Sequence, residues 1–205
     1  MSKARKAGIF GSGLSLSGDS PALILAVLAV VIELFGNGAR ELFRYAREGV
    51  LDGEWWRLLT GHVTHLNPGH LALNLAGLAL VWLLFRRDYK LHEWIWIIFA
   101  SVAAMDTGFL WLNPQLHWYV GLSGLLHGLM AAGVLRWIQE GAWEAWALAV
   151  GLAAKLVWEQ FGGALPFTAE AAGGPVVVDA HLYGTVGGLL AGLWFTLRQR
   201  AAACV

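Results

Sequence analysis

The chain has 205 residues, of which 58% are hydrophobic and only 14% are charged, and its formal net charge is zero. A soluble domain usually carries about a quarter charged residues, so this deficit excludes an ordinary water-facing surface and favours a membrane protein. A zero net charge provides no basic field for a nucleic-acid partner. The single cysteine, Cys204, excludes a disulfide framework and a cysteine-based metal site.

Six apolar segments are candidate membrane spans, since a spanning helix needs roughly 20 mostly apolar residues. They lie at about 20–36, 69–86, 92–112, 120–138, 142–162 and 179–198. The basic residues before the first segment resemble those of a signal peptide, but no convincing cleavage site follows and five more candidates do. We predict an all-α membrane protein in which residues 1–205 form one domain, a bundle of six transmembrane helices.

Two longer connections join these segments. In the first, residues 37–68, the sequence ARELFRYAREGV places Leu42, Tyr45 and Ala46 on one helical face and charges on the other, which predicts an interfacial helix. The second runs from Ala164 to Asp179, and its Gly and Pro residues predict a mobile loop.

The basic residues predict the orientation, because cytoplasmic loops are enriched in Lys and Arg. With a cytoplasmic N-terminus, nine of the 14 basic residues fall on the cytoplasmic side. These nine are Lys3, Arg5, Lys6, Arg86, Arg87, Lys90, Arg136, Arg198 and Arg200. The other five are Arg40, Arg44, Arg47, Arg57 and Lys155. Both termini are therefore expected in the cytoplasm.

Small residues recur at every fourth position on two of the predicted spans. The last span carries Ala180, Gly184, Gly188 and Gly192, and the fourth carries Gly124, Gly128 and Ala132. Such stripes let two helix backbones come close. We therefore expect the fourth and sixth spans to pack together.

Ser123 and His181 lie at the outer ends of those two spans, beside their stripes. Alone, a serine in a membrane helix usually bonds to its own backbone, and a histidine at a span end is usually interfacial. Packing of the stripes would bring the two together, and a serine becomes a useful nucleophile when a positioned base takes its proton. Their joint occurrence favours a hydrolytic site near the external face, where water is available.

His70 and Asn74 are candidates for an oxyanion hole. They are four residues apart at the start of the second span, so they share a helix face. An imidazole and an amide can both donate hydrogen bonds to a developing negative charge. The backbone N–H of Ser123, in the first turn of a helix, is a further donor.

Two alternatives depend on the histidines. His62, His65 and His70 have spacings that match no common helical pair of metal ligands, and no carboxylate joins them in sequence, so we expect no metal and no cofactor. A small transporter or channel would use a histidine proton relay, but its ionisable residues would be spread along the depth of a pore rather than gathered at one end.

Three motifs in this order resemble those of the rhomboid intramembrane serine proteases. They are HLNPGHLALN on the second span, GLSG on the fourth and AHLYG on the sixth, and GEWWRLLTGHVTHLNPGH resembles the Trp-Arg segment of the rhomboid first loop. The resemblance covers about Glu54 to Gly192. Within that superfamily, WWRLLTGHVTHLN, GLSGLLHG and DAHLYG are most similar to the rhombosortases, a compact six-helix branch.

The resemblance implies roles for the candidate residues. Ser123 would be the nucleophile, His181 the general base, and His70 with Asn74 part of the oxyanion hole. Supporting positions would be Gly121, Gly124, Gly184, Gly188 and His127. His127 takes the place where typical rhomboids have an aromatic ring under the catalytic histidine. No carboxylate is expected as a third member, since Asp179 points to another side of its helix than His181.

The resemblance also implies a substrate and a location. Rhombosortase substrates are membrane-anchored proteins with a C-terminal Gly-Gly motif, a hydrophobic helix and a basic tail, cleaved near the outer face of the inner membrane of Gram-negative bacteria. The alternative is a non-catalytic relative that binds membrane helices without cutting them. The presence of both Ser123 and His181 argues against that alternative.

Overall fold

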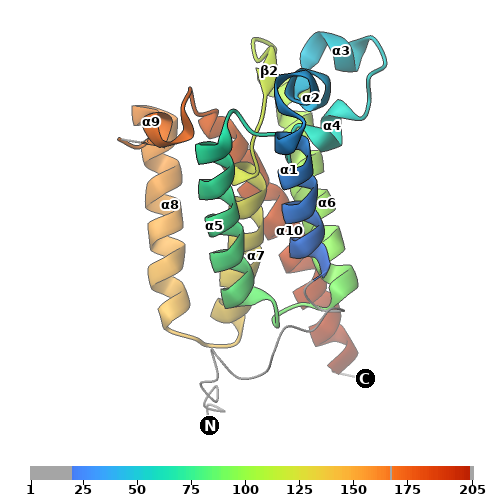
Figure 1. Cartoon of the computed structure of the whole chain (residues 1–205). Helices are drawn as coiled ribbons and strands as arrows, with labels where there is room; N and C mark the ends of the chain where they lie inside the picture. Colours follow the sequence, from blue (N-terminus) through green and yellow to red (C-terminus); the bar gives the residue numbers. More distant parts are fainter. Residues whose placement is uncertain (1–19, 167, 204–205) are drawn as a thin grey trace.

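The computed structural model describes residues 20–166 and 168–203, and these residues form a mostly helical chain (Figure 1). In chain order the elements are α1 (Ser20–Leu34), α2 (Gly36–Phe43), β1 (Tyr45–Ala46), α3 (Arg47–Leu51), α4 (Arg57–Thr60), α5 (Pro68–Phe85), α6 (Leu91–Thr107), the π-helix η1 (Gly108–Leu112), β2 (Trp118–Tyr119), α7 (Ser123–Gln139), α8 (Glu144–Gly162), α9 (Thr168–Ala172) and α10 (Val178–Ala203). The expected all-α class is confirmed.

The longest helices of the described chain, α1, α5, α6, α7, α8 and α10, fall on the predicted spans and lie side by side (Figure 1). Two segments, Pro68–Phe85 and Leu91–Leu112, are long and apolar enough to cross a membrane, and α1 is apolar but shorter. The number of six spans therefore stays a prediction. Cys204 and the basic residues Lys3, Arg5 and Lys6 lie outside the described residues.

Helices α7 and α10 pack backbone against backbone along the two small-residue stripes. A Cβ added to Gly124 would lie 2.8 Å from the carbonyl oxygen of Ala180. One added to Gly128 would lie 2.6 Å from the carbonyl oxygen of Gly184. Only glycine allows this approach, so the packing expected from the spacing is found. It fixes the relative depth of the two helix N-termini.

The prediction of one interfacial helix over ARELFRYAREGV is wrong, because a short strand interrupts the helix. The chain leaves α2 at Arg44, whose backbone is extended (φ −60°, ψ 147°), and β1 then pairs antiparallel with β2, with Tyr45 opposite Tyr119. Tyr45 is fully buried, whereas Leu42 is exposed. Helical periodicity could not reveal this break, because the partner strand lies far along the sequence.

Arg57, on the short helix α4, organises this first connection. Its guanidinium pairs with Glu54 and donates to the carbonyl oxygens of Glu41 and Arg44, each at 2.9 Å. The following turn reaches the bundle through Gly61, whose carbonyl accepts a 3.1 Å hydrogen bond from the N–H of Gly121. The connection is thereby tied to the start of α7.

The bundle has two distinct ends. The short elements α2, α3, α4, β2 and α9 gather at one end, together with the N-termini of α5, α7 and α10 (Figure 1). Helix α1 begins and α10 finishes at the opposite end, which also holds the turn between α5 and α6 (Figure 1).

Many large apolar side chains face outward, among them Leu23, Leu80, Trp96, Phe99, Trp158 and Leu190.

The connection between α8 and α10 lies beside the N-terminus of α5. We refer to its described residues, 163–166 and 168–177, as the roof segment. Asn67 caps α5 by accepting a 2.9 Å hydrogen bond from the N–H of His70, and its amide donates to the carbonyl of Ala172 at 2.9 Å. Gly173 has a positive φ of 71°, and a Cβ there would collide with the Asn67 amide. The expected loop thus contains α9 and contacts α5.

Candidate active site

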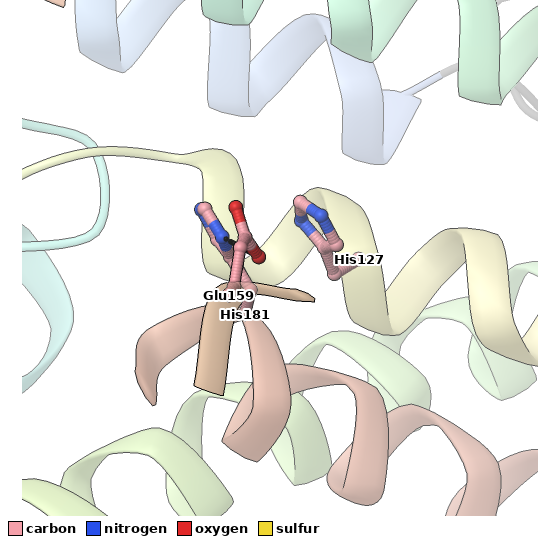
Figure 2. A group of neighbouring side chains, drawn as sticks. All are labelled: His127, Glu159 and His181. Atoms are coloured by element: carbon pink, nitrogen blue, oxygen red, sulfur yellow. Dashed lines mark hydrogen bonds and ion pairs between the residues drawn. The ribbon is translucent and has the colours of Figure 1, made fainter. Parts of the chain in front are cut away.

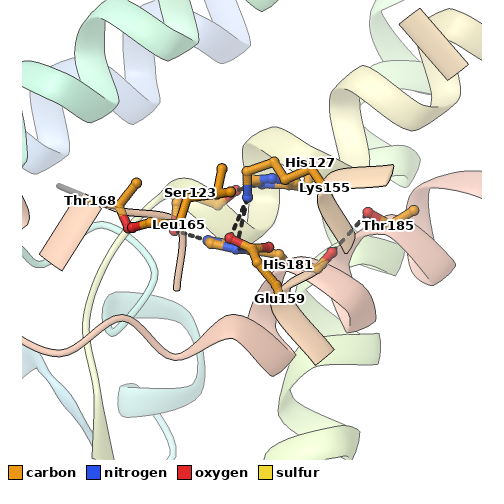
Figure 3. Close-up of polar contacts among 8 residues, drawn as sticks. All are labelled: Ser123, His127, Lys155, Glu159, Leu165, Thr168, His181 and Thr185. Atoms are coloured by element: carbon orange, nitrogen blue, oxygen red, sulfur yellow. Dashed lines mark hydrogen bonds and ion pairs between the residues drawn. The ribbon is translucent and has the colours of Figure 1, made fainter. Parts of the chain in front are cut away.

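Ser123 and His181 are in hydrogen-bond contact, with the serine Oγ 2.9 Å from the histidine Nε2 (Figure 3). Ser123 is the first residue of α7, and His181 lies in the first turn of α10. His181 is buried, with 4% of its surface exposed, and Thr185 donates to its carbonyl oxygen at 2.8 Å. A hydroxyl facing an imidazole nitrogen is the arrangement of a nucleophile and its base.

Gly121 shapes the approach to the serine. Its φ of 129° is in a region that side chains with a Cβ rarely adopt. A Cβ at this position would also meet the His70 ring, 3.2 Å from Nε2. The buried hydroxyl of Tyr119 donates to the Gly121 carbonyl at 2.7 Å, and burial raises the pKa of Tyr119. This turn therefore passes against the His70 ring two residues before Ser123.

His70 is prepared to donate from its Nε2 atom. The backbone N–H of Leu66 points at Nδ1 from 3.4 Å, so Nδ1 accepts and the ring proton sits on Nε2, the side near Gly121. The Asn74 amide donates one hydrogen to the His70 carbonyl at 3.1 Å, which leaves its second N–H available. Both side chains line the same cavity as Ser123.

We expected no carboxylate as a third member beside Ser123 and His181, but the structure places one in contact with His181. An oxygen of Glu159, on α8, lies 2.9 Å from Nδ1 of His181. Lys155, one turn earlier on α8, lies 2.6 Å from the other Glu159 oxygen and 3.3 Å from the same Nδ1. Asp179 is held elsewhere, accepting from the Asn113 amide at 2.6 Å. The carboxylate thus comes from a helix distant in sequence rather than from the neighbourhood of His181.

His127 lies against His181, with ring centroids 4.1 Å apart and planes 16° from parallel. Its Nδ1 donates to the Ser123 carbonyl across 2.7 Å. Figure 2 shows both rings and the Glu159 carboxylate grouped together. An imidazole therefore occupies the position under the candidate base, as the resemblance implied.

His127, Glu159 and His181 also qualify by distance as a metal site, since their ligand atoms lie within 4.8 Å of one another (Figure 2). Imidazole lone pairs lie in the ring plane, and the two stacked rings direct theirs along parallel planes instead of toward one point. Both nitrogens of His181 already face partners. The donor set thus favours a hydrogen-bonded arrangement over a cation.

The histidines of the first connection do not gather as metal ligands. His62 pairs with Asp106 on α6 at 3.1 Å, and its ring stacks on Phe109. His65 is buried with no hydrogen-bond partner at either ring nitrogen and contacts the His70 ring edge-on. Burial, and then repulsion from His70, lowers the pKa of His65 to about 3.

A cavity of about 720 Å³ has Ser123 and His181 in its lining. Helices α5, α7 and α8 and the roof segment contribute its walls. Its polar lining includes His70, Asn74, Ser123, Lys155, Glu159 and His181, and its apolar lining includes Leu66, Leu73, Val120, Leu126, Val176 and Val177. The cavity is suited to an apolar chain that presents one polar group to Ser123.

Sequence reasoning missed Glu159 as a site residue and counted Lys155 only as a basic residue. A signal was present, because Lys155 and Glu159 are four residues apart in an apolar segment and ionisable residues in a membrane span mark function by default. Tyr119 was also missed. Its role depends on a hydrogen bond to Gly121 that local spacing does not indicate.

The model of the Rhomboid domain family matches residues 52–198, which is most of the chain and includes every candidate site residue. No curated protein matches the sequence. Rhomboid domains are integral membrane proteins and, apart from inactive members, intramembrane serine proteases that act on membrane-protein substrates. The chain belongs to the rhomboid family.

Proposed function

We propose that this rhomboid is an active intramembrane serine endopeptidase, with Ser123 as nucleophile and His181 as general base. The observation that carries the proposal is the 2.9 Å contact between Ser123 Oγ and His181 Nε2 inside a cavity. A non-catalytic member would have no requirement for this alignment. The proposed reaction needs neither a metal nor another cofactor.

The proposed reaction begins when Nε2 of His181 takes the hydroxyl proton as Oγ of Ser123 attacks the scissile carbonyl carbon. The resulting oxyanion receives hydrogen bonds from Nε2–H of His70, from the Asn74 amide and from the backbone N–H of Ser123. His181 then gives its proton to the leaving nitrogen as the C–N bond breaks. Water, deprotonated by His181, hydrolyses the acyl-enzyme and frees Ser123.

For the substrate we propose membrane-anchored proteins with a C-terminal Gly-Gly motif, a hydrophobic helix and a basic tail. The similarity of the motifs to rhombosortases supports this choice. The apolar lining from Leu73, Leu126 and Val176 suits a hydrophobic helix, and a glycine pair offers an unobstructed backbone to Ser123.

We place the protein in the bacterial inner membrane, with both termini cytoplasmic and the site near the periplasmic face. Arg86, Arg87 and Lys90 belong to the turn between α5 and α6, at the end of the bundle opposite Ser123 (Figure 1). Basic residues favour the cytoplasmic side. The site then faces the compartment from which water enters.

Labelling with a fluorophosphonate probe tests the nucleophile. We expect the purified protein to be labelled, and Ser123→Ala to lose the label while remaining folded. Cleavage is then measured on a reporter ending in Gly-Gly, an apolar helix and a basic tail, with an Ala-Ala reporter as the matched control. A protein that binds the reporter but is neither labelled nor cleaves it is the non-catalytic alternative.

A further inference from the structure

Two charged side chains of α8, Lys155 and Glu159, stand beside His181 at the edge of the cavity (Figure 3). Building on the proposed protease function, we propose that Glu159 is a positioning residue that holds the proton of His181 on Nδ1. We further propose that Lys155 holds Glu159 in place. The site is then a Ser-His-Glu arrangement completed by a fourth residue, instead of a dyad.

The contacts define the proton positions. Nδ1 of His181 lies 2.9 Å from Glu159 Oε2, and Nε2 lies 2.9 Å from Ser123 Oγ. An ionised carboxylate can only accept hydrogen bonds, so Nδ1 must be the protonated nitrogen. Nε2 then presents a lone pair to the serine hydroxyl. This is the tautomer in which His181 can act as a base.

Lys155 favours the opposite tautomer whenever it is not bound to Glu159. Its ammonium group only donates, and it lies 3.3 Å from Nδ1. A hydrogen bond from Lys155 to Nδ1 would require the ring proton to sit on Nε2, where it would block removal of the Ser123 proton. The shorter Lys155–Glu159 distance, 2.6 Å, shows that the ammonium is directed to the carboxylate.

Burial explains why the carboxylate needs Lys155. The Glu159 side chain is 1% exposed, whereas that of Lys155 is 28% exposed. A buried charge is tolerated when it is paired and hydrogen-bonded, and here one oxygen meets the ammonium while the other meets the imidazole. The ammonium also neutralises the carboxylate while His181 is uncharged.

Kinetics of α8 variants test the assignment on the reporter substrate. We expect Glu159→Gln to lower kcat roughly 10²–10⁴-fold with little change in KM, as for the loss of a carboxylate partner in a soluble triad. Glu159→Asp should retain more activity than Glu159→Gln. The double variant Lys155→Met/Glu159→Gln should be more active than Glu159→Gln alone, because it removes the competing donor. Glu144→Gln, an exposed glutamate on the same helix, is the matched control.

The pH–rate profile gives a readout that a purely structural role would not move. The groups facing His181 are Ser123 and His127 from α7 and Lys155 and Glu159 from α8. Loss of the carboxylate disfavours the imidazolium, so Glu159→Gln should move the acid limb to lower pH. Loss of the ammonium favours the imidazolium, so Lys155→Met should move it to higher pH.

The tautomer can be observed without substrate, from ¹⁵N chemical shifts of the His181 ring in histidine-labelled protein, assigned with His181→Ala. We expect a protonated Nδ1 in the wild type and a protonated Nε2 in Glu159→Gln. Wild-type kcat, acid limb and ring shifts in a folded Glu159→Gln protein would overturn the proposal. If the expected shifts appear but Ser123 is not labelled by fluorophosphonate, the protease function falls and the tautomer assignment stands.

Discussion

Ser123 Oγ and His181 Nε2 lie 2.9 Å apart because the helices that carry them touch through their backbones close by, at Gly124, the residue after Ser123, and at Gly184, about one turn after His181. The distance between nucleophile and base is therefore fixed by residues that have no side chain. Chemistry and packing depend on the same interface between α7 and α10.

Substitution of either member of the pair should abolish cleavage. Ser123→Ala and His181→Ala should each lose activity and keep the helical fold, and the double variant should be no worse than either single one, because the two residues act as a unit. Rates on the reporter and circular dichroism of each purified variant are the measurements. Substantial cleavage by Ser123→Ala would contradict the mechanism.

Gly184→Leu should inactivate the enzyme although Gly184 takes no part in the reaction. Any Cβ at this position would overlap the carbonyl of Gly124, so α10 must move and the contact between Ser123 and His181 must lengthen. A displacement of about 1 Å can reduce the rate roughly 100-fold. Gly151→Leu is the control, because a Cβ on Gly151 meets no atom within 4 Å. Equal activity of the two variants would refute the dependence on packing.

Asn74→Ala should lower kcat without abolishing it. One oxyanion donor is worth roughly 10²–10³-fold in a soluble protease, and His70 and the Ser123 N–H remain. Water reaching the cavity can replace part of the lost hydrogen bond, so the lower end of that range is expected. Asn37→Ala, on helix α2, whose residues do not line the cavity, is the control, and an unchanged kcat in Asn74→Ala would remove Asn74 from the oxyanion hole.

His127→Phe should lower kcat, although phenylalanine keeps a ring against His181, 4.1 Å away between centroids. The substitution removes the Nδ1–H that donates to the Ser123 carbonyl across 2.7 Å and so helps to hold the nucleophile in place. A displacement of about 1 Å can reduce the rate roughly 100-fold. The kcat of His92→Phe, an exposed residue on α6, should match the wild type. If the kcat of His127→Phe also matches it, His127 is a packing residue.

The buried His65 should make the fold less stable in acid. Burial and His70 lower its pKa to about 3, against an ordinary value near 6.5. Between these two pKa values His65 is protonated in the unfolded chain and neutral in the folded one. The free energy of unfolding therefore decreases by up to about 1.4 kcal/mol for each unit by which the pH is lowered. Thermal unfolding in detergent at pH 7 and pH 5 should show a smaller loss for His65→Phe than for the wild type or for the exposed control His117→Phe. Equal losses would contradict the expectation.

Spacing was enough to predict the pairing of Ser123 with His181. Residues four apart on a helix share a face, so the stripes through Gly124 and Gly184 indicated both which helices touch and at what depth. The helices themselves followed from long apolar segments, and their ends differ from the predicted ones by a few residues. The family match is in agreement with the motifs on those helices.

Glu159 could not be placed in the same way. Helix α8 carries small residues four apart on more than one face, Ala145–Ala149–Ala153 and Ala147–Gly151, so its sequence does not specify which face meets α10. A lysine and a glutamate four residues apart also form an ordinary helical salt bridge, so this spacing does not indicate that the carboxylate contacts a histidine. The β1–β2 pair could not be predicted for a related reason, since α5 and α6 lie between Tyr45 and Tyr119 in the sequence.

The side-chain amide of Asn67 links α5, which carries His70 and Asn74, to the roof segment. Its oxygen caps α5 and its nitrogen holds the roof segment through Ala172, so lifting the roof breaks a hydrogen bond worth about 1 kcal/mol and leaves the cap beneath His70 intact. The roof segment continues directly from α8, which carries Glu159. Entry of a substrate from this side would therefore leave the proposed oxyanion donors on α5 undisturbed and act on the helix whose side chains contact Nδ1 of His181.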